Sequence, residues 1–83
     1  MKPVTIYTTP YCPFCVRAKR LLTQKKIAYE EIDVSGDDEA RDKLTARTGQ
    51  QTVPQIFIGD HHVGGSDDLY ELERKGELDA LLQ

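Results

Sequence analysis

Apolar and polar positions divide the chain into alternating strands and helices. Residues 4–8 and 28–34 are rich in β-branched and aromatic side chains, which predicts two strands, and residues 55–58 and 61–63 predict two more. Between the first two strands, Phe14, Ala18, Leu21 and Leu22 recur at the i, i+4, i+7, i+8 spacing of one helical face. A second helix is predicted at residues 38–48. A third opens within residues 64–68 and runs to Gly76, with a short final turn at residues 77–82.

This βαβαββα order indicates an α/β fold. A helix separates the first two strands, so they are expected to be parallel and joined by a right-handed crossover. Gly59-Asp60 is a two-residue hairpin signal that joins the last two strands in antiparallel order. We therefore predict a four-stranded mixed sheet flanked by helices on both faces. The second helix has a thin apolar stripe, with Ala40 and Leu44, and should lie shallowly on the sheet.

Length and composition limit what such a chain can be. With 83 residues it is expected to form one domain over residues 1–83, with room for one core and one site. The composition, 39% hydrophobic and 30% charged, is that of a folded globule rather than a disordered chain. No apolar run reaches the roughly 18 residues of a membrane span, and residues 1–5 lack the apolar block of a signal peptide. The expected location is the cytoplasm.

The charged residues are unevenly distributed. The net charge is −3, from 11 basic and 14 acidic residues. Residues 1–26 contain no acid and six cations, namely Lys2, Arg17, Lys19, Arg20, Lys25 and Lys26. Such a block is most often a solvated helix face. Nucleic-acid binding is disfavoured because the whole chain is acidic and no aromatic residues are interleaved with the cations.

The chain has two cysteines, in the sequence Cys12-Pro13-Phe14-Cys15 at the start of the first helix. Unpaired N–H groups and the helix dipole favour a thiolate at Cys12, and Arg17 and Lys19 are expected to add to this effect. Cys15 lies one turn deeper and should be buried and protonated, which leaves Cys12 as the nucleophile. Residues three apart on a helix are close enough to form a disulfide. The pair therefore indicates redox chemistry.

Two other interpretations of the cysteines remain open. They could be incidental buried thiols, or they could hold a metal ion or an iron–sulfur cluster. A metal or cluster needs four ligands, and the chain offers two cysteines besides His61 and His62. Neighbouring residues of a strand point to opposite faces, so both histidines cannot reach one ion. Metal binding would then require two chains.

A second group of residues has the features of a ligand site. A cis bond before Pro54 would leave the Val53 N–H and C=O unpaired within the sheet and able to bind an extended peptide. In Gly64-Gly65-Ser66-Asp67, backbone amides at a helix N-terminus can bind a carboxylate and the Asp67 carboxylate can bind an ammonium group. Together these groups fit the head of an α-amino acid. Taken singly, Val-Pro is usually a turn and the second motif usually a helix cap.

Three sequence blocks together resemble the glutaredoxins, most closely the small bacterial glutaredoxin 3 group. They are Cys12-Pro13-Phe14-Cys15, residues 52–58 and residues 64–69, and the resemblance runs from residue 4 to residue 82. It implies a thioredoxin fold and a glutathione-dependent disulfide oxidoreductase, with glutathione as co-substrate and no tightly bound cofactor or metal. It also implies that Cys12 attacks first and that Cys15 resolves intermediates with protein disulfides.

The same resemblance implies a glutathione site. Thr52 and Val53 would pair with the cysteinyl part of glutathione beside a cis Pro54, and Ser66 and Asp67 would hold its γ-glutamyl head. Relatives commonly have a lysine three residues before the first cysteine, where this chain has Thr9, so Arg41 is expected to bind the glycine carboxylate instead. The full set of expected glutathione-binding residues is Phe14, Arg41, Thr52, Val53, Pro54, Gly65, Ser66 and Asp67.

The expected partners are glutathione and proteins that carry disulfides or glutathione mixed disulfides, with ribonucleotide reductase as one candidate. No nucleic acid or membrane is expected, and the protein should be a monomer. Two alternatives share the fold. A thioredoxin-like reductant served by a flavoprotein reductase is disfavoured because no Trp lies beside the cysteines. A dimeric iron–sulfur carrier is disfavoured because Pro13 stands where cluster-binding relatives tend to have Gly.

Overall fold

The computed structural model describes residues 2–83 and follows the predicted order of elements. The elements are β1 (Val4–Thr8), α1 (Pro13–Gln24), β2 (Glu30–Asp33), α2 (Asp38–Thr48), β3 (Gln55–Ile58), β4 (His61–Gly64), α3 (Ser66–Arg74) and α4 (Leu78–Leu82). The second strand is shorter than predicted, because its pairing with β1 begins only at Glu30. The expected final turn is a separate helix, α4, which buries Leu78 and Leu82.

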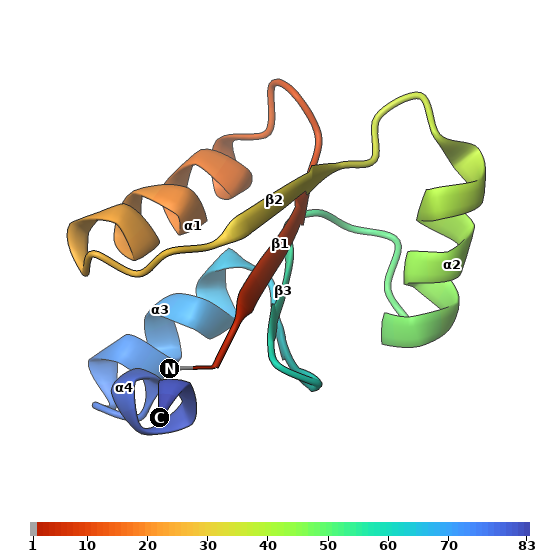
Figure 1. The fold of residues 1–83 in the computed structure, drawn as a ribbon. Helices are drawn as coiled ribbons and strands as arrows, with labels where there is room; N and C mark the ends of the chain where they lie inside the picture. The colour runs from red at the N-terminus through yellow and green to blue at the C-terminus, as the bar shows by residue number, and fades with distance from the viewer. Residues whose placement is uncertain (1) are drawn as a thin grey trace.

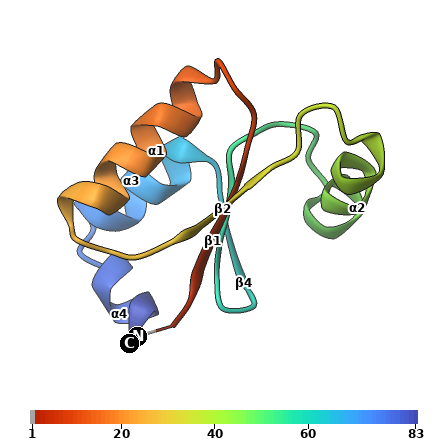
Figure 2. The same ribbon diagram turned by 45° about the horizontal axis from the view of Figure 1, so that its top comes forward.

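The four strands form one mixed sheet in the order β2-β1-β3-β4. β1 pairs with β2 in parallel and with β3 in antiparallel orientation, and β3 pairs with β4 in antiparallel orientation. Helices α1, α3 and α4 lie on one face of this sheet and α2 lies on the other (Figures 1 and 2). The predicted mixed sheet with helices on both faces is confirmed (Figures 1 and 2).

The main core lies between the sheet and the layer of α1, α3 and α4. Strict alternation along β1 turns Val4, Ile6 and Thr8 toward this layer. The most deeply buried large apolar side chains all belong to this core: Ile6, Leu22, Ile56, Ile58, Leu69 and Leu78. The Lys2 N–H donates to the Leu82 carbonyl at 2.6 Å, which fixes α4 against the start of the chain.

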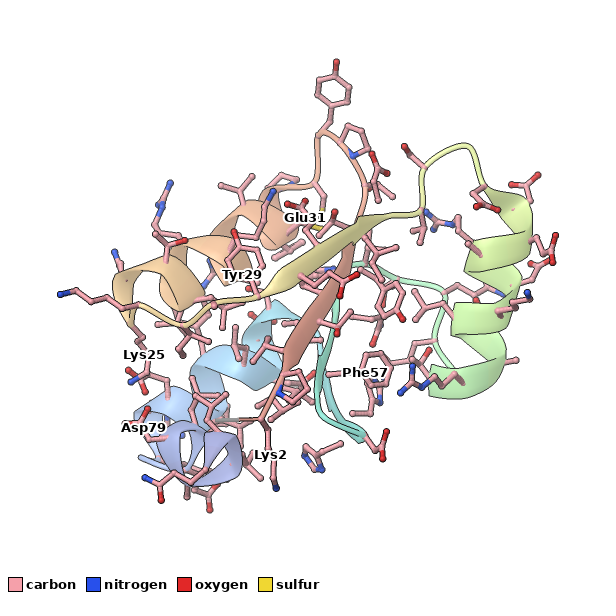
Figure 3. The ribbon with its side chains drawn as sticks, viewed as in Figure 1. Lys2, Lys25, Tyr29, Glu31, Phe57 and Asp79 are labelled. Carbon is pink, nitrogen blue, oxygen red and sulfur yellow. The ribbon has the colours of Figure 1, made fainter. Side chains whose placement is uncertain are left out.

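The opposite face of the sheet is covered more thinly, as the weak apolar stripe of α2 predicts. Of the residues of α2, Leu44 is buried. Farther along the helix, the Arg47 guanidinium lies 3.9 Å from the centre of the Phe57 ring, which in turn packs edge-on against Tyr7. Figure 3 shows Phe57 on the side of the sheet that faces α2. Among residues 2–83, no helix combines the length and the apolar composition that a membrane span requires.

Candidate active site

Cys12 is the N-cap of α1, and its side chain takes part in the cap. Its backbone is extended, with φ −102° and ψ 106°, and its Sγ accepts the Cys15 N–H at 3.1 Å. Pro13 fits the first helical turn because an N–H at that position would have no partner. The preceding residue, Tyr11, has φ 63°, and this left-handed turn directs its side chain into solvent. A sulfur that already accepts an amide N–H is well placed to carry negative charge.

Cys15 lies behind Cys12 and is 1% exposed. Burial and, as a smaller cause, a hydrogen bond to Cys12 raise the pKa of the Cys15 thiol to about 12. The Thr9 backbone N–H and the positive charge of Lys19 act in the opposite direction and are weaker. Both cysteines are free thiols. The structure therefore has the accessible first cysteine and the buried, protonated second one that the sequence predicts.

The segment before β3 approaches Cys12 from the sheet side. The Val53–Pro54 peptide bond is cis, and Pro54 is buried whereas Thr52 is exposed. The Val53 carbonyl lies outside the paired strands and accepts the Cys12 thiol at 3.7 Å. The bond needs the thiol proton, so ionisation of Cys12 would remove it. The segment predicted to bind a peptide thus lies directly beside the predicted nucleophile.

A buried residue that the sequence analysis missed, Gln55, anchors this segment. Its side chain is fully buried, and its Nε2 donates to Gln50 Oε1 at 2.9 Å and to the Thr52 carbonyl at 3.0 Å. Its Oε1 lies 2.6 Å from His62 Nε2, so that nitrogen must carry a proton. The available signal was a polar side chain within the otherwise apolar strand Gln55–Ile58. Gln55 thus fixes Thr52 relative to the sheet.

The N-terminus of α3 forms the third side of the site. An added Cβ on Gly65 would lie 3.6 Å from the Pro54 carbonyl, so this helix end adjoins the cis-proline segment. The Asp68 carboxylate accepts the Gly65 N–H at 3.0 Å and thereby caps the helix. Within the described residues, the buried Ser66 Oγ has no hydrogen-bond partner. The Asp68 carboxylate therefore occupies the Gly65 N–H, and the Asp67 side chain beside it is exposed.

Arg17 and Lys19, which were expected to favour a thiolate at Cys12, are both engaged by carboxylates. Lys19 Nζ lies 3.0 Å from Glu31, whose carboxylate also accepts the buried Thr8 hydroxyl at 2.7 Å. These contacts hold the pKa of Glu31 below its ordinary value, with the Thr8 hydrogen bond the larger cause, and raise the pKa of Lys19. Figure 3 shows Glu31 on β2 close to the start of α1.

Three further ion pairs connect α1 and its C-cap with the C-terminal helices. Arg17 lies 3.9 Å from the Asp67 carboxylate and stacks on the Tyr70 ring at 5.1 Å. At the far end of α1, Lys25 bridges Glu73 at 2.9 Å and Asp79 at 3.1 Å (Figure 3). Three of the six cations of residues 1–26, namely Arg17, Lys19 and Lys25, thus pair with acids that lie far from them in the chain. Arg17, which was not assigned to the site, belongs to its α3 end.

The remaining predicted glutathione-binding residues lie around these three segments. Phe14 is 52% exposed on the first turn of α1. Arg41 donates from Nη2 to the Gln51 carbonyl at 3.3 Å and borders an open groove of about 470 Å³. Asp38 and Asp42 line the same groove, so a carboxylate bound to Arg41 would also face their negative charge. Across residues 2–83, the side chains of His, Cys, Asp and Glu form no cluster of three or more suited to a metal ion.

An accessible cysteine at a helix N-terminus, backed by a buried one and facing a cis-proline segment on this sheet, defines a thiol–disulfide oxidoreductase of the thioredoxin fold. The comparison with known families narrows the class. The family model for glutaredoxin matches residues 4–63, and the chain belongs to the glutaredoxin family.

Relatives match over nearly the whole chain. A curated glutaredoxin of Pseudomonas aeruginosa is 56% identical over 82 residues, which cover 99% of this chain and 98% of the relative. Glutaredoxin 3 of Escherichia coli is 47% identical over 83 residues and the full length of both chains. Among solved structures, a buckwheat glutaredoxin–glutathione complex has a TM-score of 0.92 at 36% identity, covering 98% of this chain and 76% of the other. A Brucella melitensis glutaredoxin has a TM-score of 0.89 at 55% identity, covering 99% and 89%.

Proposed function

We propose that the protein is a glutathione-dependent oxidoreductase that reduces glutathione mixed disulfides and protein disulfides through Cys12 and Cys15. The observation that carries the proposal is the position of the Cys12 sulfur, 3.1 Å from the Cys15 N–H and 3.7 Å from the Val53 carbonyl. A peptide that pairs with Val53 brings its own sulfur to this point. The solved complex of the buckwheat relative with glutathione supports glutathione as the peptide.

The substrate would bind across the three segments of the site. The exposed Thr52 and the half-buried Val53 offer backbone groups to the cysteinyl part of glutathione, as in the addition of a strand. Ser66 and the amides that begin α3 bind the γ-glutamyl carboxylate, and Asp67 binds its ammonium group. Arg41 binds the glycine carboxylate at the opposite end. Phe14, Pro54 and Gly65 shape the floor and rim of the site.

In the first half of the reaction, the Cys12 thiolate attacks the glutathione sulfur of a mixed disulfide. A bond forms between Cys12 and glutathione, the original disulfide breaks, and the released protein leaves as a thiolate that takes up a proton. A second glutathione thiolate then attacks the glutathione sulfur on Cys12. Oxidised glutathione leaves and the Cys12 thiolate returns, stabilised by the Cys15 N–H.

With a protein disulfide, Cys12 forms the mixed disulfide with the protein and Cys15 resolves it. The Cys15 sulfur attacks Cys12, the reduced protein leaves, and an intramolecular disulfide remains for glutathione to reduce. Burial raises the pKa of Cys15, so this step depends on loss of the Cys15 proton as Cys15 attacks.

The setting of this reaction is part of the proposal. Cys12 and Cys15 are free thiols at the spacing of a redox-active pair, and such a pair suits a reducing compartment, which favours the cytoplasm. The protein would act as a monomer on glutathionylated or disulfide-containing proteins, with ribonucleotide reductase as one candidate, because the site is assembled from one chain. Sedimentation of the purified protein and localisation of a tagged copy test these two statements.

Two cysteine variants test the mechanism. Cys12→Ser should abolish the reduction of glutathionylated substrates, because it removes the nucleophile. Cys15→Ser should keep that activity and lose the two-cysteine reduction of protein disulfides. The measurement is glutathione-dependent release of a thiol from each substrate class. Activity of Cys12→Ser on glutathionylated substrates would contradict the assignment.

An Asp67 variant tests the binding site. Asp67→Ala removes the proposed partner of the ligand ammonium, so the KM for a glutathionylated substrate should rise about tenfold. A mixed disulfide of cysteinylglycine lacks the γ-glutamyl head and serves as the matched substrate, for which KM should stay unchanged. An equal effect on both substrates would mean that Asp67 affects the helix and not the ligand.

A further inference from the structure

A chain of side-chain hydrogen bonds begins at the cis-proline segment and ends at a histidine that has no role in the site described so far. Gln55 and Phe57 alternate along β3, so both lie on the face of the sheet that α2 covers (Figure 3). Phe57 pairs with His62 across the two strands, which places the His62 side chain on the same face. His62 is half-buried, whereas its neighbour His61 is exposed and points to the opposite face of β4.

The contacts of the Gln55 side chain fix the direction of its amide. Its Nε2 lies 3.0 Å from the Thr52 carbonyl oxygen, an atom that can only accept a hydrogen bond, so the NH₂ group faces Thr52. The same Nε2 donates its other proton to Gln50 Oε1 at 2.9 Å. The Gln55 Oε1 is then an acceptor, and it lies 2.6 Å from His62 Nε2. His62 is therefore held in the form that carries a proton on Nε2.

A second contact orients the His62 ring. This ring lies 5.0 Å from the ring of Phe57, at an interplanar angle of 32°. Phe57 is buried, and it is held in turn by the edge-on Tyr7 ring and by the Arg47 guanidinium of α2. Packing on Phe57 thus sets the plane of the His62 ring, and the proton on Nε2 sets the direction of the Gln55 amide.

We propose that His62 is a positioning residue of the glutathione site, which holds the backbone at Thr52 in place through the Gln55 amide. This inference rests on the proposed function, in which the backbone of Thr52 and Val53 pairs with the cysteinyl part of glutathione. Without a proton on His62 Nε2, two acceptors would face each other at 2.6 Å, and the Gln55 amide would turn its oxygen toward the Thr52 carbonyl. The segment would then lose its anchor, and its ordering would weaken the binding of substrate.

Two variants separate the donor on Nε2 from the bulk of the ring. His62→Gln keeps an N–H donor at the end of an unbranched side chain, and His62→Met has a similar length and no donor. The substrates are the mixed disulfides of cysteine with glutathione and with cysteinylglycine, because both carry the cysteinyl part. His62→Met should raise KM for both substrates about three- to tenfold with kcat unchanged, the scale of one hydrogen bond. His62→Gln should keep KM near the wild-type value, and His61→Met, the same change at the exposed neighbour, should leave it unaltered.

A double variant tests whether His62 acts through Gln55. In Gln55→Leu the link to the Thr52 carbonyl is already lost, so the addition of His62→Met should raise KM no further. Two independent effects on KM would instead multiply.

The proton on Nε2 can also be observed in the wild-type protein, so the test does not depend on the folding of a variant. Proton–nitrogen correlation NMR of the histidine rings distinguishes the two ring nitrogens. We expect the neutral ring of His62 to carry its proton on Nε2 and none on Nδ1.

Four results would each overturn the inference. They are an unchanged KM in His62→Met, an equal rise of KM in His62→Gln and His62→Met, multiplying effects in the double variant, and a neutral His62 ring with its proton on Nδ1. A wild-type protein that fails to reduce the glutathione mixed disulfide would instead refute the proposed function, and the NMR measurement would still report on the His62 ring.

Discussion

Closure of the disulfide between Cys12 and Cys15 should be governed by how rarely Cys15 is a thiolate. Burial raises the pKa of Cys15 to about 12, so at pH 7 about one molecule in 10⁵ carries the Cys15 thiolate. Once Cys12 carries glutathione, its contribution to the raised pKa disappears, but burial, the largest cause, remains. Cys15 therefore still titrates above the neutral range, and each unit of pH multiplies its thiolate fraction about tenfold.

The perturbation is a change of pH on protein glutathionylated at Cys12. Between pH 7 and pH 9, the rate at which Cys15 displaces glutathione should rise about 100-fold, with a slope near 1 in a plot of log rate against pH. Acid quenching, alkylation of the remaining thiols and mass spectrometry follow the reaction. Cys15→Ser, which cannot close, is the control. A plateau below pH 9 would refute the reasoning, because it would mean that Cys15 ionises near its ordinary value.

The surroundings of Cys15 offer a second perturbation in the same assay. The positive charge of Lys19 lowers the pKa of Cys15, although it is the weakest of the causes. Lys19→Met removes that charge and should slow closure at any fixed pH. Faster closure in Lys19→Met would show that Lys19 acts on Cys15 in the opposite sense.

Three further predictions concern the frame of the site. Gln55→Leu should lower the free energy of unfolding by about 1–3 kcal/mol and raise the KM for glutathione, because it removes the hydrogen bond from Gln55 to the Thr52 carbonyl. Denaturant titration measures the first effect and enzyme kinetics the second. An unchanged KM would mean that Gln55 does not position Thr52 for the ligand. Ser66→Ala should change the free energy of unfolding by less than about 1 kcal/mol, because the Ser66 hydroxyl has no hydrogen-bond partner within the described residues. The same variant should raise the KM for a glutathionylated substrate roughly tenfold. An unchanged KM would mean that Ser66 does not contact the ligand. The pKa of Glu31 lies below its ordinary value, so the stabilising effect of Glu31 is present at neutral pH and is lost as pH falls from that ordinary value through the lowered pKa. Glu31→Gln should therefore weaken the fall in the free energy of unfolding at acid pH. An unaltered fall would mean that the hydrogen bond from Thr8 to Glu31 adds nothing to stability.

Much of the fold could be predicted because the boundaries of its elements are set locally. The predicted bounds of β1, α2 and β3 agree with the structure, and each is marked by residues that act on their neighbours. Asp37 caps the first turn of α2 by accepting the Ala40 N–H, and Gly49 ends the helix in a left-handed conformation. β2 was predicted too long because its bounds depend on where its partner strand begins, which the local pattern does not specify.

Within the candidate site, too, local features could be predicted from the sequence and contacts between distant residues could not. The Cys12 cap and the burial of Cys15 follow from positions within one helical turn and could be inferred from spacing. The contact between Cys12 and Val53 joins residues 41 positions apart, and no local pattern gives its distance. The pairing of Arg17 with Asp67 was missed for the same reason. Gln55 was missed because the hydrogen bonds of a buried amide depend on which loops pack around it.

The sequence by itself determined the order of the elements, the placement of the cysteine pair at a helix N-terminus and the amino-acid pocket as a hypothesis. These follow from backbone geometry and side-chain spacing over a few residues. Only the tertiary structure decided which cations near Cys12 form ion pairs and which do not. The acids that neutralise Arg17, Lys19 and Lys25 are distant in sequence, and they meet these cations because the sheet and helices pack together. Of the α1 cations, packing pairs Arg17 and Lys19 and leaves Arg20 without an ion pair among the described residues, since ion pairing acts over a few ångströms of space rather than along the chain.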